Sequence, residues 1–245
     1  LGGFTLDYGP FGFIDRFDPK YQPWTGGGDH FSFFNQPQAA MQNFYMFSKA
    51  VHPMIKSDTM AVEELEKILN GFPEAMQEQV EAMWASKLGL EAFDAELYNE
   101  LMMLMIKTSV DYTIFFRELS HLPEEVTPLQ KSFYADTSNN EELLKRWSQW
   151  LEKWQSSIDV TTPETRAKLS EQMKSVNSKY TLREWFLVPA YKAAEKGDYS
   201  LIEELQEVMT KPYDEQSKEM EAKYYAKKPS QFFDIAGISH VSCSS

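Results

Sequence analysis

Residues 5–15 carry the most information on the fold: Thr5-Leu6-Asp7-Tyr8-Gly9-Pro10-Phe11-Gly12-Phe13-Ile14-Asp15. Asp, Gly and Pro close together favour a tight turn for purely local reasons, because each suits a particular turn position. The surrounding residues, from 1 to about 37, show recurrent Gly and Pro, dense aromatic residues and no sustained helical period. This pattern predicts a loop-rich N-terminal segment.

From about Ala39 to Tyr225 the apolar residues fall mostly at helical spacing. Trp147, Trp150 and Trp154 repeat at intervals of three and four, which places them on one helical face, and we expect that face to be core rather than a stacking platform. Gly89 after Leu88 is typical of a helix C-terminal cap. The chain is therefore predicted to be mainly α.

Helix starts are indicated by a hydroxyl residue followed three positions later by glutamate, the capping-box pattern. It occurs at Ser138, Thr161 and Ser200. The most apolar run, residues 101–106, is far shorter than the roughly 20 residues that span a bilayer. We expect it to form a buried helix.

Composition excludes several classes of function. The chain has 245 residues, 42% hydrophobic and 14% aromatic, so it is a globular protein despite its net charge of −13. That charge repels phosphate backbones and anionic lipids, so we expect neither nucleic acid nor membrane as the main partner. A phosphate ligand would need a local cation such as a metal ion. One cysteine excludes an internal disulfide framework and indicates a reducing compartment.

Asp7 has two interpretations. The first is a turn residue without a ligand. The second is that Asp7 stands where protein kinases place the aspartate of Asp-Phe-Gly, whose carboxylate holds a Mg²⁺ ion that bridges the phosphates of ATP. Asp-Tyr-Gly alone does not distinguish between them.

The longer block from Thr5 to Pro19 resembles, nearly residue for residue, the signature of the selenoprotein O family. Other stretches are similar to that family in the same order along essentially the whole chain. They are Phe34-Asn35-Gln36-Pro37, Asp111-Tyr112-Thr113-Ile114-Phe115-Phe116-Arg117-Glu118-Leu119, Lys179-Tyr180-Thr181-Leu182-Arg183, Ala193-Ala194-Glu195-Lys196-Gly197-Asp198-Tyr199, Lys211-Pro212-Tyr213-Asp214 and Cys243-Ser244-Ser245.

The resemblance implies the helical C-terminal lobe of a protein-kinase-like fold and an ATP-dependent protein adenylyltransferase, which transfers AMP to Ser, Thr or Tyr hydroxyls of protein substrates. Asp7 is carried over as the ligand of Mg²⁺ and the neighbour of ATP. The resemblance also places the catalytic base and a second metal ligand just ahead of Leu1. We therefore expect a fragment that lacks its N-terminal lobe and is inactive alone, so that this stretch contains no catalytic residue.

Within the expected single domain, the resemblance and the pattern together indicate three parts. Residues 1–38 form the Asp-Tyr-Gly segment with an activation-loop-like region, 39–228 form the helical lobe, and 229–245 form a tail. Cys243 in that tail corresponds to a position implied to be redox-active, with a possible thiol partner; from spacing alone it is a free surface thiol. The compartment is expected to be cytoplasmic for a bacterial source, and mitochondrial or plastid for a eukaryotic one.

Several residues keep open alternatives. Arg117 and Arg183 fit substrate contact or an ion pair that packs helices. The histidines His30, His52, His121 and His240 show no metal-ligand spacing and are interpreted as structural or exposed. Phe11, Phe13 and Phe17 would be exposed where an upper lobe is missing. The alternative function is a non-catalytic helical interaction module that binds through helix-in-groove contacts.

Overall fold

The computed structural model describes residues 12–137 and 140–241, and this part of the chain is mainly helical. Its first stretch, from Gly12 to Asn35, contains no α-helix and only two short 3-10 turns, η1 (Asp29–Phe31) and η2 (Phe33–Asn35). No helix in the described residues has both the length and the apolar character that crossing a bilayer requires.

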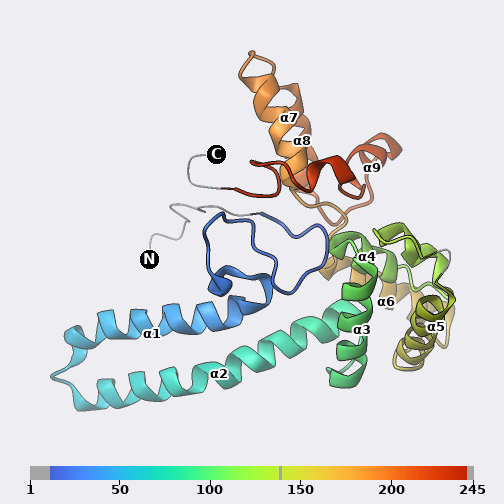
Figure 1. Cartoon of the computed structure of the whole chain (residues 1–245). Helices are drawn as coiled ribbons and strands as arrows, with labels where there is room; N and C mark the ends of the chain where they lie inside the picture. The colour runs from blue at the N-terminus through green and yellow to red at the C-terminus, as the bar shows by residue number, and fades with distance from the viewer. Residues whose placement is uncertain (1–11, 138–139, 242–245) are drawn as a thin grey trace.

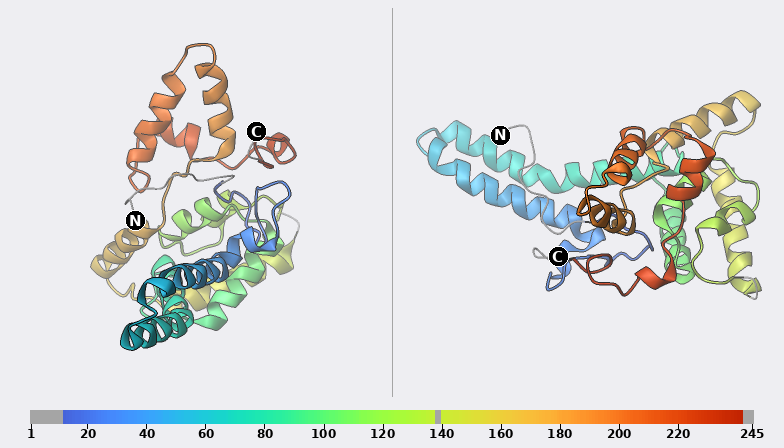
Figure 2. Two further views of the ribbon diagram at one scale, coloured as in Figure 1. Left: turned by 90° about the vertical axis from the view of Figure 1, so that its left-hand side faces the viewer. Right: turned by 90° about the horizontal axis from the view of Figure 1, so that it is seen from above.

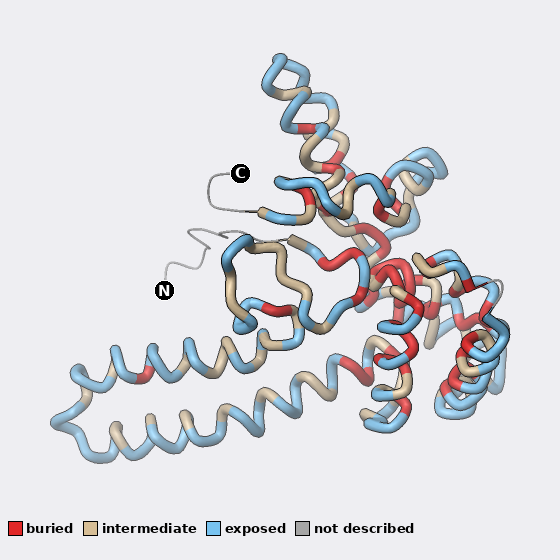
Figure 3. Tube along the Cα trace, viewed as in Figure 1, coloured by how far each residue is buried: buried red, intermediate tan, exposed pale blue. Residues whose placement is uncertain are grey.

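Helices α1 (Gln36–Ile55) and α2 (Thr59–Leu88) form a long antiparallel hairpin that projects from the body (Figure 1). The side chain of Asp58 caps α2 by accepting a hydrogen bond from the backbone N–H of Ala61 at 3.1 Å. Phe44 and Phe72 stack across the hairpin with ring centroids 4.8 Å apart. Most of the hairpin is exposed; apart from Ser48 on α1, its buried residues lie where α2 enters the body (Figure 3).

Gly89 ends α2, as the sequence predicts, in the left-handed conformation with φ +68°. Its N–H donates to the carbonyls of the last helical turn, which satisfies acceptors that an α-helix leaves open. A Cβ at this position would lie 2.7 Å from Sδ of Met173 and 3.0 Å from Cδ1 of Leu169. Gly89 therefore serves both the turn and the close approach of the next helices.

The main core lies at the inner end of the hairpin (Figure 3). It is built by α2 together with α3 (Ala95–Thr108), α4 (Tyr112–Leu119), the 3-10 helix η3 (Thr127–Ser132), α5 (Glu141–Ser156) and α6 (Pro163–Val176). The predicted tryptophan face of α5 is confirmed as core: Trp147, Trp150 and Trp154 are each at most 1% exposed. Their indole N–H groups donate to Thr108 Oγ1, the Leu97 carbonyl and the Leu88 carbonyl, so each of these three buried donors is paired.

A second, smaller core joins α7 (Glu184–Ala194), α8 (Ser200–Thr210) and α9 (Lys218–Tyr224). Helices α7 and α8 rise together from the body in Figure 1 and in the left view of Figure 2. Helix α4 belongs to both cores, because Ile114 contacts the second while Phe115, Phe116 and Leu119 belong to the first. After α9 the chain forms the short 3-10 helix η4 (Ser230–Phe232).

Some local predictions were wrong. Thr162, not Thr161, caps α6, and its box partner is Thr165 rather than a glutamate. Ser200 is already inside α8 and makes no cap, while Ser138 lies outside the described residues and Asn140 caps α5. The run 101–106 lies in α3 with four of its six residues buried, as expected, while Met103 and Ile106 are 50% and 43% exposed.

The phenylalanines expected to be exposed differ from one another. Phe17 is 3% exposed and stacks on Tyr112, with ring centroids 5.9 Å apart. The prediction for Phe17 was therefore wrong, because this side chain is buried against α4 and no upper lobe is needed to cover it. Phe13 is 41% exposed, and Phe11 lies outside the described residues.

Candidate functional site

The two residues singled out as site residues by the sequence, Asp7 and Cys243, lie outside the described residues. The segments that adjoin them are described, and the segment before Cys243 is hydrogen-bonded to the loop that follows Asp7. Val241, two positions before Cys243, donates its N–H to the Pro23 carbonyl at 2.8 Å and accepts the N–H of Thr25 at 2.8 Å. The described end of the tail is thus paired by backbone hydrogen bonds with the N-terminal loop, and the two lie beside each other in Figure 1.

The loop that follows Asp7 is itself fixed to the start of α4 by its backbone. Phe17 donates its N–H to the Val110 carbonyl at 2.7 Å, and Tyr112 donates to the Asp15 carbonyl at 2.9 Å. These two bonds enclose an isolated antiparallel bridge between Arg16 and Asp111. Asp15 is eight residues beyond Asp7, so the chain is anchored within about 28 Å of Asp7 even when fully extended.

Beneath this backbone contact, Arg183 pairs with two buried aspartates. Its Nη1 donates to Asp15 Oδ1 at 2.7 Å and to Asp111 Oδ2 at 2.7 Å, and its Nη2 donates to Asp111 Oδ1 at 2.9 Å. The side chains of Arg183 and Asp111 are 2% and 0% exposed. We call Arg183, Asp15 and Asp111 the buried ion cluster.

Local structure places each member of the cluster. Arg183 precedes the first residue of α7, and Asp111 is the N-cap of α4, where Oδ1 also accepts the Ile114 N–H at 3.1 Å. The Tyr134 hydroxyl donates to Asp111 Oδ2 at 2.9 Å and accepts the backbone N–H of Lys228 at 2.9 Å. The cluster thereby connects the N-terminal loop, both cores and the tail.

The charges in the cluster act against the cost of burial. Burial raises the pKa of Asp15, and the positive charges of Arg183 and Lys228 oppose that rise. For Arg183 burial acts against the charged form, but the carboxylates of Asp111 and Asp15 outweigh it and raise the pKa of the guanidinium. A permanently charged guanidinium shared by two carboxylates leaves net negative charge, which the nearby Lys228 ammonium, 3.6 Å from Asp15 Oδ2, compensates.

Arg117 lies in a second buried network. It is 1% exposed and donates to the carbonyls of Lys174 and Asn177 at 3.3 and 3.2 Å and to Glu215 Oε1 at 2.6 Å. Lys179 also donates to Glu215, and to Glu221 at 3.0 Å. Of the two interpretations left open for Arg117 and Arg183, the structure shows packing ion pairs for both.

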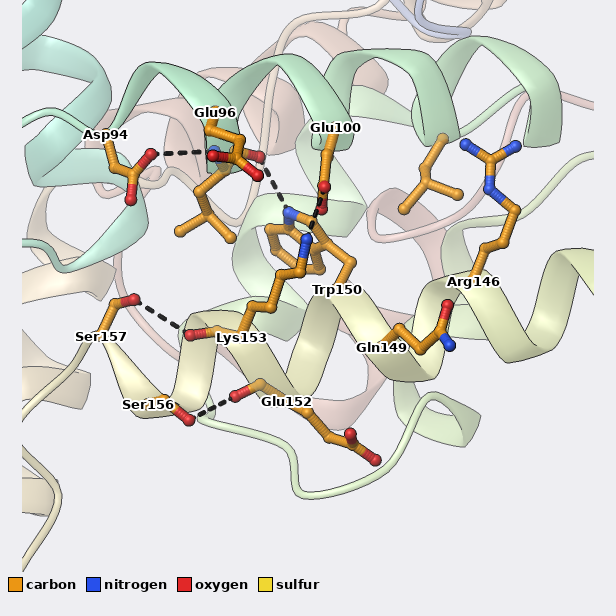
Figure 4. Close-up of a pocket in the computed structure, with 12 residues that line it drawn as sticks. Asp94, Glu96, Glu100, Arg146, Gln149, Trp150, Glu152, Lys153, Ser156 and Ser157 are labelled. Carbon is orange, nitrogen blue, oxygen red and sulfur yellow. Dashed lines mark hydrogen bonds and ion pairs between the residues drawn. The ribbon is translucent and has the colours of Figure 1, made fainter.

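A groove of about 820 Å³ between α3 and α5 offers a contrast (Figure 4). Lys153, which projects into it, is 2.5 Å from Glu100, and the Trp150 indole donates to a backbone carbonyl. Its acidic side chains, Asp94, Glu96, Glu100 and Glu152, outnumber its two cations, Arg146 and Lys153. The residues that line this groove therefore include no cluster of unpaired cations that could bind the phosphates of a nucleotide.

The described residues contain no group of three or more His, Cys, Asp or Glu side chains arranged to hold a metal ion. The histidines among them, including His30 and His240, belong to no such group. The sequence pointed to Asp15, Asp111 and Arg183 only as parts of family-like blocks. Tyr134 and Lys228 carried no signal, because their roles arise from contacts between distant parts of the chain.

Comparison with known proteins agrees with the resemblance seen in the sequence. The family model described as "Protein adenylyltransferase SelO" matches residues 1–210. The protein nucleotidyltransferase YdiU of Flavobacterium johnsoniae is 34% identical over 99% of this chain and 47% of its own length. YdiU proteins of Aromatoleum aromaticum and Vibrio parahaemolyticus are 35% and 33% identical, again over 99% of this chain, and 46% and 48% of their own lengths.

The chain therefore belongs to the SelO family of protein adenylyltransferases, a family of nucleotidyltransferases. It spans about half the length of the curated relatives it matches. Membership implies the use of a nucleotide and of protein substrates at the level of the family.

Proposed function

We propose that this chain is the helical C-terminal part of an ATP-dependent protein adenylyltransferase with a protein-kinase-like fold, which transfers AMP to Ser, Thr or Tyr hydroxyls. The observation that carries the proposal is the anchoring of the loop after Asp7. Backbone pairing with the α3–α4 junction and the buried ion cluster hold Asp15 in place. A carboxylate that has to be held in one position relative to the triphosphate of ATP needs such a fixed support.

Asp7 is proposed to contact ATP through Mg²⁺. Magnesium in nucleotide sites is usually held by one or two carboxylates and by the phosphates themselves, so this role needs no cluster of three protein ligands. When bound, the ion withdraws charge from the phosphate oxygens. The part played by this chain is to present one carboxylate on an anchored loop.

The proposal assigns no catalytic base to residues 1–245, so these residues alone are expected to be inactive. Cys243 is proposed as a redox-active thiol that exchanges with a partner thiol. Support for its placement comes from Val241, whose two backbone bonds hold the described end of the tail against residues 23–25. Replacing Cys243 with Ser should abolish trapping of thiol partners; unchanged trapping would contradict this role.

The adenylyltransferase is tested with two labelled nucleotides. The protein expressed from its full reading frame is incubated with a bacterial protein mixture and ATP labelled at either the α- or the γ-phosphate. Transfer of AMP labels proteins from the α position only, whereas phosphorylation labels them from the γ position. Asp7→Asn should reduce α labelling by about 100-fold or more, the scale for losing one electrostatic contact in the transition state.

Asp29→Asn provides the matched control, because Asp29 lies in the same N-terminal stretch, is exposed and is not part of the buried ion cluster. An equal loss of α labelling in both variants would show that a disturbed loop, rather than the missing Asp7 carboxylate, causes the loss. Labelling from the γ position alone would replace adenylyl transfer with kinase activity.

A helical interaction module is the second candidate, favoured by the α1–α2 hairpin. This hairpin exposes large apolar side chains: Phe47 at 52%, Met54 at 82%, Met60 at 81% and Ile68 at 51%. Apolar side chains at helical spacing are the contacts that a helix-in-groove partner uses. Absence of α labelling, together with a stable complex lost on Met54→Ser and Met60→Ser replacement, would favour the module.

A further inference from the structure

A polar pocket lies where the anchored loop meets the tail. Its volume is about 240 Å³, and its walls come from two segments far apart in the sequence. The loop contributes residues between Asp15 and Gln22, and the tail contributes Lys228, Phe233, Ser239 and His240. The pocket therefore exists only when the tail is folded against the loop.

Two cations of this pocket have no acidic partner. Among the described residues, no carboxylate lies within ion-pair distance of Arg16 or Lys20, although both are exposed and the chain is strongly acidic. The Arg16 guanidinium lies over the Phe233 ring, 4.8 Å from its centroid. This cation–π contact holds the guanidinium in place, and no hydrogen bond to another described residue occupies its N–H groups.

A third cation of the pocket, Lys228, is buried and hydrogen-bonded. Lys228, 6% exposed, donates to Ser239 Oγ at 2.6 Å, and Ser239 donates to the Phe232 carbonyl at 2.7 Å. Of the two carboxylates in the walls, Asp15 is already paired with Arg183, and Asp18 accepts the backbone N–H of Lys20 at 2.9 Å. Lys228 already compensates the charge of Asp15, so Arg16 and Lys20 remain against the one carboxylate of Asp18, and the walls carry net positive charge.

The volume and the position of the pocket limit the kind of ligand that it can bind. Small-molecule sites occupy roughly 300–1,000 Å³, so a pocket of about 240 Å³ fits a single anionic group better than a nucleotide. The pocket is open to solvent beside the loop that continues from Asp7, within the reach set by eight residues of chain. An acceptor polypeptide whose hydroxyl lies near Asp7 can therefore place in this pocket a side chain from within about eight residues of that hydroxyl.

We propose that this pocket binds a glutamate or aspartate side chain of the acceptor polypeptide, and so gives the enzyme a preference for hydroxyls in acidic sequences. Arg16 and Lys20 make the ion pairs, and Lys228 provides positive charge beneath them. This inference rests on the proposed function for its substrate, but its binding step is measured without AMP transfer.

The test uses the protein expressed from its full reading frame and a short fluorescein-labelled tyrosine peptide with glutamates on both sides of the tyrosine. Its counterpart carries glutamines instead. At constant ionic strength, fluorescence anisotropy should give a dissociation constant about fivefold lower for the glutamate peptide, the scale of one or two exposed ion pairs. Arg16→Gln and Lys20→Gln should each reduce this ratio, and the double variant should bring it to one.

Lys49→Gln is the matched control, because Lys49 is an exposed cation over an aromatic ring, 4.5 Å from the Tyr45 centroid, on α1 outside the pocket. It should leave the ratio unchanged. Equal binding of the two peptides, or an equal effect of Lys49→Gln, overturns the inference. If the wild-type protein labels substrates from α-labelled ATP but shows no preference between the peptides, the inference fails while the proposed function stands.

Discussion

Arg183 and Asp111 form a two-point ion pair that is closed to solvent, with Nη1–Oδ2 at 2.7 Å and Nη2–Oδ1 at 2.9 Å. The planar guanidinium suits the planar carboxylate, so this pair fixes orientation as well as distance. Asp15 adds a third hydrogen bond to the same guanidinium. One side chain therefore holds together the N-terminal loop, the first turn of α4 and the approach to α7.

Replacing Arg183 with Met should destabilise the fold by about 3–5 kcal/mol, because two buried carboxylates lose their partner. Urea denaturation followed by circular dichroism measures the change. Arg183→Lys keeps the charge but not the two-point geometry, and it should fall between Met and the wild type. Arg146→Met on α5, where no ion pair is described, should change stability by less than about 0.5 kcal/mol. A similar loss at both positions would show that the cluster does not stabilise the fold.

Glu215 should make the protein sensitive to acid. Burial favours its neutral form, but Lys179 and Arg117 outweigh burial and lower the pKa of its carboxyl from 4.5 to about 2. A lowered pKa in the folded state contributes stability above pH 4.5 that is lost as the pH falls toward 2. Glu215→Gln should lower stability at neutral pH and flatten the decline over this range. Glu207→Gln, whose side chain has no described partner, is the control; equal curves for both variants would contradict the prediction.

Lys87 should make the stability of the protein depend on pH in the alkaline range. Burial lowers the pKa of its ammonium from 10.5 to about 8, and its Nζ lies 4.5 Å from the Phe116 ring centroid. Between these values the unfolded chain binds more protons than the folded one, so Lys87 makes stability rise with pH from about 8 to 10.5. The difference between wild type and Lys87→Met, followed by chemical denaturation at several pH values, should show this rise. A flat difference would contradict it; Lys107→Met is the exposed control.

Gly89, which caps α2, and Gly71, which lies inside it, should respond in opposite directions to alanine. Gly89→Ala forces a left-handed backbone and a contact with Met173, and should cost at least about 1–2 kcal/mol. Gly71 is helical and a Cβ there meets nothing within 4 Å, so Gly71→Ala should stabilise by roughly 0.5–1 kcal/mol. Thermal melts of the two variants measure both signs. A stabilising Gly89→Ala would disprove the role of its conformation.

Sequence patterns predicted the features that depend on near neighbours. The tryptophan face of α5 and the cap at Gly89 follow from spacing and backbone preference, and both are confirmed. The start of α6 was misplaced by one residue because Thr161 and Thr162 are both good caps. In the structure Thr161 instead donates to Asp159, which leaves Thr162 to cap.

The buried ion cluster could not be derived from the sequence in the same way. Asp15 and Arg183 are 168 positions apart, and no periodicity links them. Likewise, Phe17 was expected to be exposed where an upper lobe is missing, yet it packs on Tyr112. Only the path of the chain between distant segments determines which charges and rings meet.

The α1–α2 hairpin has a consequence for local unfolding. Helix α2 has 30 residues and is therefore about 45 Å long, yet its buried residues are Trp84, Ala85 and Leu88 at its inner end. The distal turns are stabilised by few tertiary contacts, so their amides should exchange with deuterium much sooner than those near Trp84. The hairpin would thus open from its tip inward while the protein remains folded, which leaves its outer half free to adapt its shape to whatever approaches it.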